Sequence, residues 1–361
     1  MATPIRVLRV IYDLQVGGVQ RMLLRLIPHL RDAGVEVEVC CLRFEGDMAP
    51  RFRELGVPIH MVPFRSRLDP IGILRLRALI NRGMFDVVHS HMYASNMAAN
   101  LACRLGSRAR LVNSYHSQTP WRGESQRRMI RWTARMPDRI VAISGAVREP
   151  LESLGLKARL ATIHNGVEVP PVAPPSREAP SGAPVALFWA GRFVRQKRVT
   201  MLVELAAALR GAGVAFTMDL IGEGPELDRV KARAAELGVA DVVRFPGLQA
   251  DIRPSIQAGD LYLSASDREG LSNSLLEVCA GGRGFVVADI SPNREVLADT
   301  SSGICLGDDL GAWVAAISGL AKDREAIARM GRAAHARAGD FSIRRTSALT
   351  VEMYRELLAK P

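Results

Sequence analysis

The chain has 361 residues, of which 48% are hydrophobic and 24% charged, and its mean hydropathy of +0.07 is close to neutral. Because roughly 100–200 residues make one domain, this length predicts two domains, and the composition excludes a disordered chain. No apolar run approaches the ~18–20 residues that a membrane span needs, and Arg6 and Arg9 interrupt the first apolar segment. The five cysteines form no C-x-x-C pair, which indicates reduced thiols and a cytoplasmic protein.

The net charge of +11 is confined to the first half of the chain. Residues 1–170 hold 25 Lys and Arg against 14 Asp and Glu, whereas residues 171–361 hold 23 of each kind. This asymmetry predicts that the N-terminal half faces something anionic, such as a membrane leaflet, a phosphorylated substrate or nucleic acid. We disfavour nucleic acid as a partner, because no recognised nucleic-acid motif accompanies the charge.

Short apolar runs alternate with segments of helical period from the start of the chain. Strands are expected at 5–12, 35–42, 85–90, 109–116 and 139–144, and helices at about 18–34, 93–105, 124–136 and 145–154. This alternation is typical of a parallel sheet with crossover helices. Residues 170–184 then carry six prolines without a hydrophobic period, which predicts an exposed, extended linker.

The same alternation restarts after the prolines. Strands are expected at 185–190, 216–222, 242–245, 260–266 and 285–289, and helices at about 199–211, 226–237, 273–280 and 343–359. We therefore predict an N-terminal domain (1–170), a linker (171–184), a second doubly wound domain (185–342) and a C-terminal helix (343–361) that can pack on either domain. Two such domains imply a cleft between the carboxyl ends of both sheets, so the strand-to-helix loops carry the chemistry.

The first-domain loops offer glycines and histidines. Gly17 and Gly18 lie between the first strand and its helix, where backbone amides can approach a phosphate or a sugar, or where the glycines simply make a tight turn. The loop lacks the G-x-G-x-x-G fingerprint, which argues against a nicotinamide cofactor. His89 and His91 have a spacing that suits a metal, but no third ligand is evident, so we predict no metal site there.

Two loops of the second domain carry basic residues and glycines. Arg192 and Lys197 follow the strand at 185–190 and can hold a diphosphate from two sides, the Arg as a planar fork and the Lys as a point charge. The alternative is a solvated basic loop. Gly222 and Gly224 follow the next strand, and they either let the backbone run close to a ligand or simply make the turn.

The strongest local pattern lies at 266–277. It places Glu269 in a loop and Glu277, eight residues on, in the first turn of a helix, with the free amides of that helix between them. This suits a nucleotide sugar, whose phosphate would meet the amides near Ser272, Asn273, Ser274 and Leu275. Alternatively, Ser274 and Glu277 have the spacing of a capping box, in which case Glu277 only closes the helix N-terminus.

Taken together, these loops resemble the retaining glycosyltransferases of GT-B type, the glycosyltransferase group 1 family that includes many bacterial polysaccharide and glycolipid sugar transferases. The resemblance covers nearly the whole chain and rests on the motifs at 17–21, 89–91, 165–167, 191–198, 222–225, 266–277 and 293–297. It implies an α/β fold of two doubly wound Rossmann-like domains facing a central cleft, and the activity of a hexosyltransferase. The sequence departs from the family's usual motifs at two places: at Arg198, where a glycine is usual, and at residues 281–284.

The resemblance also implies roles for individual residues. Arg192 and Lys197 would neutralise the donor diphosphate. Glu277 would hold the ribose, and Glu269 would touch the transferred sugar. His116, which ends the strand at 109–116, would lie beside the donor sugar as a polarising or positioning group.

Gly18 would lie near the phosphate and the acceptor. No D-x-D sequence occurs in the chain, so the usual aspartate cage for a metal on the diphosphate is missing. We therefore predict a metal-independent reaction that needs no cofactor besides the nucleotide-sugar co-substrate.

The acceptor is expected on the basic first domain, as a glycan or a lipid-linked precursor. The segment 121–135 combines arginines with Trp121 and Trp132, a composition typical of an interfacial helix, and it predicts peripheral contact with the inner face of the plasma membrane. The alternative is a solvated basic helix whose Met129, Ile130 and Trp132 face the core.

Two other functions fit the same motifs. One is a GT-B-like nucleotide-sugar epimerase, which would convert the donor alone. The other is a non-catalytic nucleotide-sugar-binding subunit, which would bind the donor and turn nothing over. A transferase would hydrolyse the donor slowly or need an acceptor.

Overall fold

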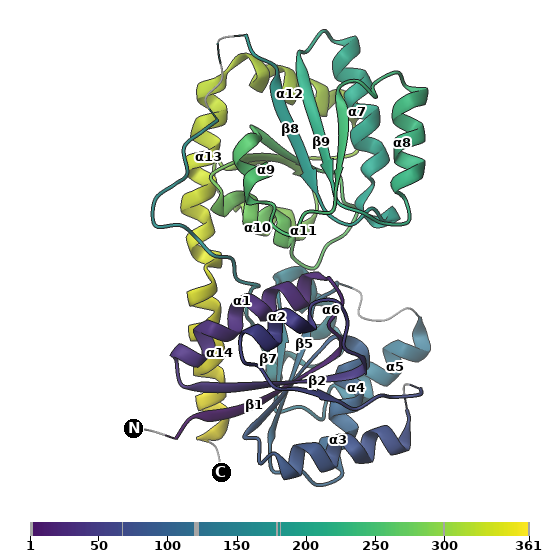
Figure 1. The fold of residues 1–361 in the computed structure, drawn as a ribbon, viewed down its shortest axis with the longest axis vertical. Helices are drawn as coiled ribbons and strands as arrows, with labels where there is room; N and C mark the ends of the chain where they lie inside the picture. Colours follow the sequence, from purple (N-terminus) through teal and green to yellow (C-terminus); the bar gives the residue numbers. More distant parts are fainter. Residues whose placement is uncertain are drawn as a thin grey trace. The chain divides into compact units, whose positions relative to one another are not determined.

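The structure is a computed structural model that describes residues 3–66, 68–118, 123–177, 180, 182–298 and 300–359. It divides into two compact units, the first comprising residues 1–166 and 343–361 and the second residues 167–342. Each unit contains one parallel β-sheet with helices packed on it (Figure 1). The expectation of two Rossmann-like α/β domains is therefore confirmed.

The described strands of the first unit form a seven-stranded sheet in the order β3-β2-β1-β4-β5-β6-β7. They are β1 (Ile5–Asp13), β2 (Val35–Phe44), β3 (Ile59–Met61), β4 (Val87–His91), β5 (Arg110–Tyr115), β6 (Arg139–Ala142) and β7 (Leu160–Thr162). The helices are α1 (Gly18–Asp32), α2 (Ala49–Glu54), α3 (Pro70–Arg82), α4 (Met92–Arg104), α5 (Glu124–Thr133), α6 (Gly145–Glu152) and α14 (Ile343–Leu358), with a 3-10 turn η1 (Lys157–Arg159).

Alternate residues of β1 enter two separate cores. Val7 and Ile11 pack with α1, α2 and α14, whereas Leu8 and Val10 pack with α3 and α4. A strand that is buried on both faces reads as a continuous apolar run, which is why residues 5–12 predict a strand. Arg9 is the exception, since it lies at the centre of this strand and is only 1% exposed.

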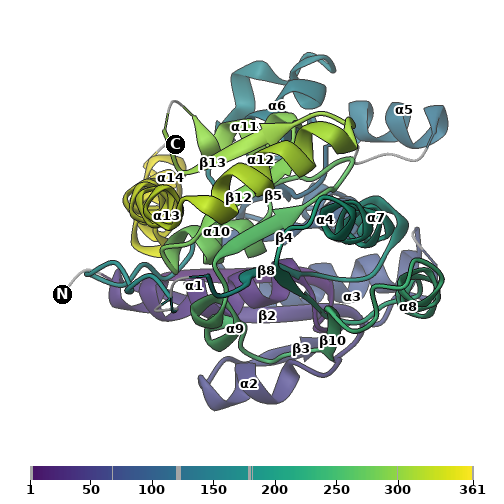
Figure 2. The same ribbon diagram turned by 90° about the horizontal axis from the view of Figure 1, so that it is seen from above.

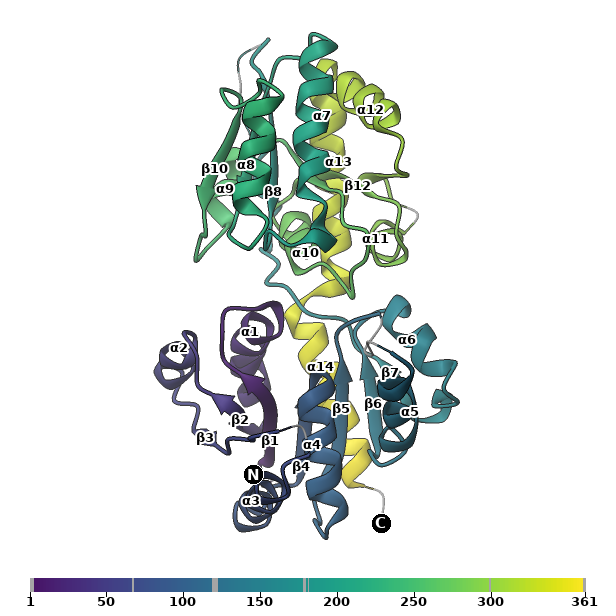
Figure 3. The same cartoon turned by 90° about the vertical axis from the view of Figure 1, so that its right-hand side faces the viewer.

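The described strands of the second unit form a six-stranded sheet in the order β10-β9-β8-β11-β12-β13. They are β8 (Val185–Ala190), β9 (Phe216–Ile221), β10 (Val243–Gly247), β11 (Leu261–Ser264), β12 (Gly284–Ala288) and β13 (Gly303–Leu306). The helices are α7 (Val199–Gly211), α8 (Leu227–Glu236), α9 (Arg253–Ala258), α10 (Asn273–Ala280), α11 (Ser291–Leu297), α12 (Leu310–Lys322) and α13 (Arg324–Ala338), with 3-10 turns η2 (Arg195–Lys197) and η3 (Gly339–Phe341). Figures 2 and 3 show α7 and α8 lying side by side in this unit.

The proline-rich segment is anchored to the second unit. Its described residues have no regular secondary structure, and residues 178, 179 and 181 lie outside the described part. Arg177 donates to both carboxylate oxygens of the buried Asp260, at 3.0 and 2.7 Å. In the described part of the chain, every helix is too short or too polar to cross a membrane.

Candidate functional site

Four of the predicted site residues follow strands at which the strand order of each sheet reverses. The order changes direction between β1 and β4 in the first sheet and between β8 and β11 in the second. At such a point the adjacent crossover helices leave to opposite sides of the sheet, so the loops beyond the strand ends leave room for a ligand. Gly18 follows β1, Arg192 and Lys197 follow β8, and Glu269 follows β11.

Lys197 and Glu269 form an ion pair between two of these loops. The Lys197 ammonium donates to Glu269 Oε1, and the Glu269 side chain is only 9% exposed. The loops are also joined beside this pair, because the Asp267 amide donates to the Gln196 carbonyl at 3.0 Å and Gln196 Nε2 donates to the Arg268 carbonyl at 2.6 Å. Since an ammonium has three N–H donors, Lys197 can bind a ligand oxygen while it holds Glu269.

Arg192 lies on the loop after β8 and is exposed. It forms no ion pair with any residue in the described part of the chain, so its guanidinium fork is available for a planar anionic ligand. Its neighbours are fixed by the backbone, because the Gly191 amide donates to the Ile221 carbonyl at 3.0 Å and the Phe193 amide donates to the Glu223 carbonyl at 2.8 Å.

Gly222 and Gly224 permit this close approach of two loops. A Cβ on Gly222 would lie 1.9 Å from the Gly191 carbonyl oxygen, and a Cβ on Gly224 would lie 2.3 Å from the Phe193 carbonyl oxygen. Both glycines also have positive φ angles, of 133° and 152°. Their contacts are therefore with the protein's own backbone, and they position the loop that carries Arg192.

Helix α10 begins at a different residue from the one that the capping-box interpretation requires. Its N-cap is Ser272, whose Oγ accepts from the Leu275 amide at 3.3 Å. Glu277 is therefore the fifth residue of the helix and lies in its second turn, not in the first. In a capping box the glutamate stands three residues after the N-cap, and the residue three after Ser272 is Leu275. The capping-box interpretation of Ser274 and Glu277 is therefore wrong.

The α10 N-terminus lies beside the Lys197–Glu269 pair along the chain. The Leu275 amide is engaged by Ser272, and Asn273 and Ser274 occupy the first turn, where amides lack carbonyl partners within the helix. Ser272 is buried, whereas Asn273 and Ser274 are half-buried. The positive end of this helix therefore follows directly on the loop that carries Glu269.

The backbone conformation at position 198 explains why a glycine is common there. Its φ of 48° and ψ of 39° place it in the left-handed region, which glycine adopts without cost. The arginine is held there by an ion pair from Nη1 to Asp308 Oδ1 at 2.5 Å. The departure from the family pattern therefore keeps the backbone conformation that the loop needs.

In the first unit, Gly18 is the first residue of α1. The loop before it is closed by Gln20, whose Nε2 donates to the Asp13 carbonyl at 3.1 Å. A Cβ on Gly17 would meet Gln20 Oε1 at 2.5 Å, so a side chain at position 17 would displace the end of the Gln20 side chain. Gly18 itself is exposed at the N-terminus of a 15-residue helix.

His116 follows β5, is half-buried, and joins a buried polar cluster on the sheet face that α14 covers. Its Nε2 lies 3.1 Å from His91 Nδ1, and His91 Nε2 lies 3.0 Å from Arg9 Nη1. His89 lies beside them, with its ring stacked on that of His91 at a centroid distance of 4.7 Å. Tyr354 of α14 bonds to His89 Nδ1 at 2.6 Å.

Burial keeps these histidines neutral. It lowers the pKa of His89 and of His91 well below 6.5, and that of His116 to about 4, and the charge of Arg9 lowers each pKa further. The described residues contain no group of three His, Cys, Asp or Glu side chains that could hold a metal ion. Sequence reasoning missed the role of Arg9, although a charged residue at the centre of an apolar strand was a visible signal.

Two family models match successive parts of the chain. The model described as Glycosyltransferase Family 4 matches residues 16–169, and the model described as Glycosyl transferases group 1 matches residues 184–323. The chain belongs to the glycosyltransferases that these two models describe.

Relatives of the glycosyltransferase include two other glycosyltransferases of named function. The lipopolysaccharide core biosynthesis glycosyltransferase LpsE of Rhizobium meliloti is 32% identical over 231 residues, which are 62% of this chain and 65% of that protein. The D-inositol 3-phosphate glycosyltransferase of Thermobispora bispora is 26% identical over 397 residues, with 95% of this chain and 91% of that protein covered.

Solved structures share the fold of this glycosyltransferase. Anabaena Alr3699/HepE in complex with UDP and glucose has a TM-score of 0.84 at 17% identity, with 98% of this chain and 100% of that chain covered. A glycosyltransferase from Rickettsia africae has a TM-score of 0.83 at 17% identity and covers both chains completely. These similarities confirm the GT-B fold.

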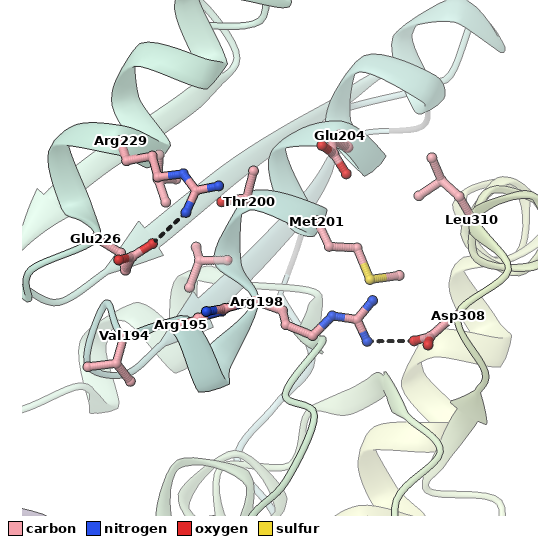
Figure 4. Close-up of a pocket in the computed structure, with 12 residues that line it drawn as sticks. Val194, Arg195, Arg198, Thr200, Met201, Glu204, Glu226, Arg229, Asp308 and Leu310 are labelled. Atoms are coloured by element: carbon pink, nitrogen blue, oxygen red, sulfur yellow. Dashed lines mark hydrogen bonds and ion pairs between the residues drawn. The ribbon is translucent and has the colours of Figure 1, made fainter.

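A pocket of about 330 Å³ lies in the second unit of the glycosyltransferase, at the start of α7 beside Arg198 (Figure 4). Three arginines and three acidic residues line it, with Arg198 paired to Asp308 and Arg229 paired to Glu226. None of the predicted site residues lines this pocket. Because its charges balance, it has no evident preference for a phosphate.

Proposed function

We propose that this glycosyltransferase transfers a sugar from a nucleoside-diphosphate sugar to a glycan or lipid-linked acceptor, with retention of configuration and without a metal ion. The observation that carries the proposal is the Lys197–Glu269 pair at the strand-order reversal of the second sheet, with Arg192 exposed on the same loop. A site with two cations and one carboxylate has the charges that a sugar diphosphate requires.

The cations act on the leaving group. As the bond between the sugar and the diphosphate breaks, negative charge builds on the diphosphate oxygens. Lys197 and the amide end of α10 are held in place before the reaction, so they would stabilise this charge without reorganising, and the exposed Arg192 would add a second cation. We propose that they replace the metal ion that other transferases place on the diphosphate.

The two carboxylates bind the neutral parts of the donor. Glu269 accepts from Lys197 through Oε1, and its second oxygen can accept from a hydroxyl of the transferred sugar. Glu277, half-buried in the second turn of α10, would accept from the ribose hydroxyls. This arrangement would couple sugar recognition to the ammonium that neutralises the leaving group.

The acceptor would meet the first unit, because residues 1–170 hold the whole net charge of the chain and all but the last four of them belong to that unit. The names of two relatives, a lipopolysaccharide core enzyme and a D-inositol 3-phosphate glycosyltransferase, support an anionic acceptor from polysaccharide or glycolipid synthesis. The HepE complex with UDP-glucose supports a nucleoside-diphosphate sugar as the donor.

The proposal is tested by a thermal-shift screen of the protein against UDP, GDP, ADP and their common sugars, each with and without a chelator. We expect one nucleotide family to raise the melting temperature to the same extent in both conditions. A shift that the chelator abolishes would contradict metal independence.

The donor that binds is then incubated with the protein and with candidate glycolipid acceptors. We expect donor turnover to depend on the acceptor and NMR to show a product with the anomeric configuration of the donor. Conversion of the donor to an epimer would favour the epimerase, and binding without turnover with any acceptor would favour the non-catalytic subunit.

A further inference from the structure

Arg9 is a fully buried cation with almost no hydrogen-bond partners. It lies at the centre of β1 and is 1% exposed, and its Nη1 bonds to His91. Its Nε and Nη2 atoms have no hydrogen-bond partner, and no carboxylate pairs with it, in the part of the chain that the structure describes. Burial lowers the pKa of Arg9, but a guanidinium does not lose its proton in a protein.

The other strongly buried arginine differs in this respect. Arg283 is 3% exposed, and its guanidinium donates to the carbonyl oxygens of Gly259, Gly281, Gly282 and Gln257 and to the side chain of Gln257. Arg283 therefore holds a loop together. Arg9 bonds to one histidine, so its contribution lies in what it does to that histidine.

The bond from Arg9 determines which ring nitrogen of His91 carries the proton. A guanidinium can only donate, so His91 Nε2 must accept and cannot carry a hydrogen. A neutral imidazole has one N–H, which must then be on Nδ1. His91 Nδ1 lies 3.1 Å from His116 Nε2, so His91 donates to His116.

The same reasoning extends to His116. Its Nε2 accepts from His91 and carries no hydrogen, so the single proton of this neutral ring is on Nδ1. That Nδ1 atom is buried and has no hydrogen-bond partner in the described residues. A buried N–H without an acceptor is costly, which points to an acceptor from outside the described polypeptide.

We infer that Arg9 and His91 are positioning residues that hold His116 in its Nδ1–H tautomer, so that His116 offers a hydrogen bond to an oxygen of a bound sugar. The assignment of the tautomers rests on the hydrogen-bond geometry and on the neutrality of the two rings, whereas the sugar oxygen rests on the proposed function. In this state His116 is not a base, because Nε2 is occupied by His91 and Nδ1 already carries a proton. His89 is not fixed in this way, since both of its partners are hydroxyl groups, which can donate or accept.

Two-dimensional ¹⁵N–¹H NMR distinguishes histidine ring nitrogens that carry a proton from those that do not. Applied to the whole protein labelled at histidine, it determines the tautomers of His91 and His116. Signals are assigned by their loss in His91→Gln and His116→Gln. At pH 7 we expect both rings to be neutral, with the proton on Nδ1. A His116 that carries its proton on Nε2, or on both nitrogens, overturns the inference.

Variants of the cluster then test the cause. Arg9→Met removes the obligatory donor with little change in volume, and we expect His91 and His116 to move to a mixture of tautomers. Arg9→Lys, which can only donate, should keep the wild-type spectrum. Tyr354→Phe is the matched control, because it removes a hydroxyl from the same cluster outside the Arg9–His91–His116 chain. If Arg9→Met leaves the tautomers unchanged, Arg9 does not set them; if it fails to fold, the wild-type and Arg9→Lys spectra still decide.

Turnover gives a second, separate result. We expect Arg9→Met to lower kcat/KM for the donor about tenfold, as the loss of one neutral hydrogen bond predicts, and Arg9→Lys to restore most of it. Should the wild-type protein turn over no donor, the proposed function fails while the NMR result stands. If the tautomers change as expected and kcat/KM does not, the bond to the sugar is overturned.

Discussion

Lys197 forms an ion pair with Glu269 and would also neutralise the proposed diphosphate. We expect Lys197→Ala to weaken binding of the nucleoside diphosphate about tenfold to a hundredfold, because a hydrogen bond to a charged group contributes about 1.5–3 kcal/mol. Isothermal titration with the nucleotide that gives a thermal shift measures this change. Glu277→Ala should likewise weaken binding through the ribose.

The matched control is Arg195→Ala, which removes an exposed cation from the same 3-10 turn as Lys197. Its side chain lines the charge-balanced pocket, so nucleotide affinity should stay close to that of the wild-type protein. Equal losses in Arg195→Ala and Lys197→Ala would mean that only overall charge matters. Wild-type affinity in Lys197→Ala would remove that residue from the site.

The variant Gly222→Ala tests whether the loop that carries Arg192 needs the close contact between Gly222 and the Gly191 carbonyl. Gly222→Ala would combine a φ of 133° with a Cβ placed 1.9 Å from a carbonyl oxygen, and such strain costs at least about 1–3 kcal/mol. We expect a lower melting temperature and weaker nucleotide binding. Gly319→Ala is the control: it lies in α12 with nothing within 4 Å of its Cβ, so it should stabilise the protein by about 0.5–1 kcal/mol. A Gly222→Ala variant as stable as the wild-type protein would contradict the packing argument.

The sequence predicts which residues lie near one another where the prediction depends on the ends of neighbouring strands. It does not predict which residue caps a helix. Lys197 and Glu269 could be placed in one site because both follow strands of one parallel sheet. The N-cap of α10 could not be chosen between Ser272 and Ser274, because either serine can cap a helix. The role of Arg9 depends on β1 and β4 being neighbours, which the local pattern does not give.

Helix α5 (Glu124–Thr133) contains most of the segment whose composition predicts membrane contact. Trp121 and Arg122 lie outside the described residues. Ile130 is buried and Met129 is half-buried, but Trp132 is 58% exposed, so the expectation that Trp132 faces the core is wrong. Arg128 and Arg131 are exposed on the same helix, which leaves a basic surface with an aromatic side chain.

We expect this surface of α5 to bind anionic membranes. Changing Arg127, Arg128 and Arg131 to Glu should lower co-sedimentation with phosphatidylserine-containing vesicles by at least about tenfold, because each basic residue near such a surface contributes about 1 kcal/mol. Trp132→Ser should lower it further. Vesicle binding that survives the triple change would exclude α5 as the contact.

A charge-matched variant separates the surface from net charge. Changing Arg229, Lys231 and Arg233 of α8 to Glu alters the total charge by the same amount in the other unit. We expect vesicle binding to stay near the wild-type level in this variant. If it falls as far as in the α5 variant, only the total charge is involved.

Several elements were predicted from apolar periodicity, but two long stretches were missed, one of them 290–342, where α11, β13, α12 and α13 lie. The helices expected at 199–211 and 273–280 match α7 and α10, whereas no element was expected at 44–84, where α2, β3 and α3 lie. A six-residue helix and a three-residue strand are too short to show a period. Helix α3 did carry a signal, because Asp69 caps it and Pro70 opens it.

At the scale of the whole molecule, the chain returns to its first unit. Helix α14 packs against α1, and its Tyr354 bonds to His89, 265 residues earlier. The sequence allowed this helix to pack on either domain, since one apolar face fits any exposed core. The contact that specifies its place is polar, and a sequence pattern does not show which distant hydroxyl completes a buried cluster.

Acid should destabilise the first unit before the second, because the buried histidines all lie in the first. The folded unit holds the pKa of His116 at about 4 and those of His89 and His91 well below 6.5, whereas the unfolded chain has ordinary values near 6.5. The unfolded state therefore binds more protons between about pH 6.5 and 4. The stabilisation is complete above pH 6.5 and is lost progressively as the pH falls toward 4. Hydrogen exchange at pH 7.5 and 5.5, corrected for intrinsic rates, should show loss of protection in β4 and β5 while β8 and β11 stay protected; equal loss in both units would contradict this origin.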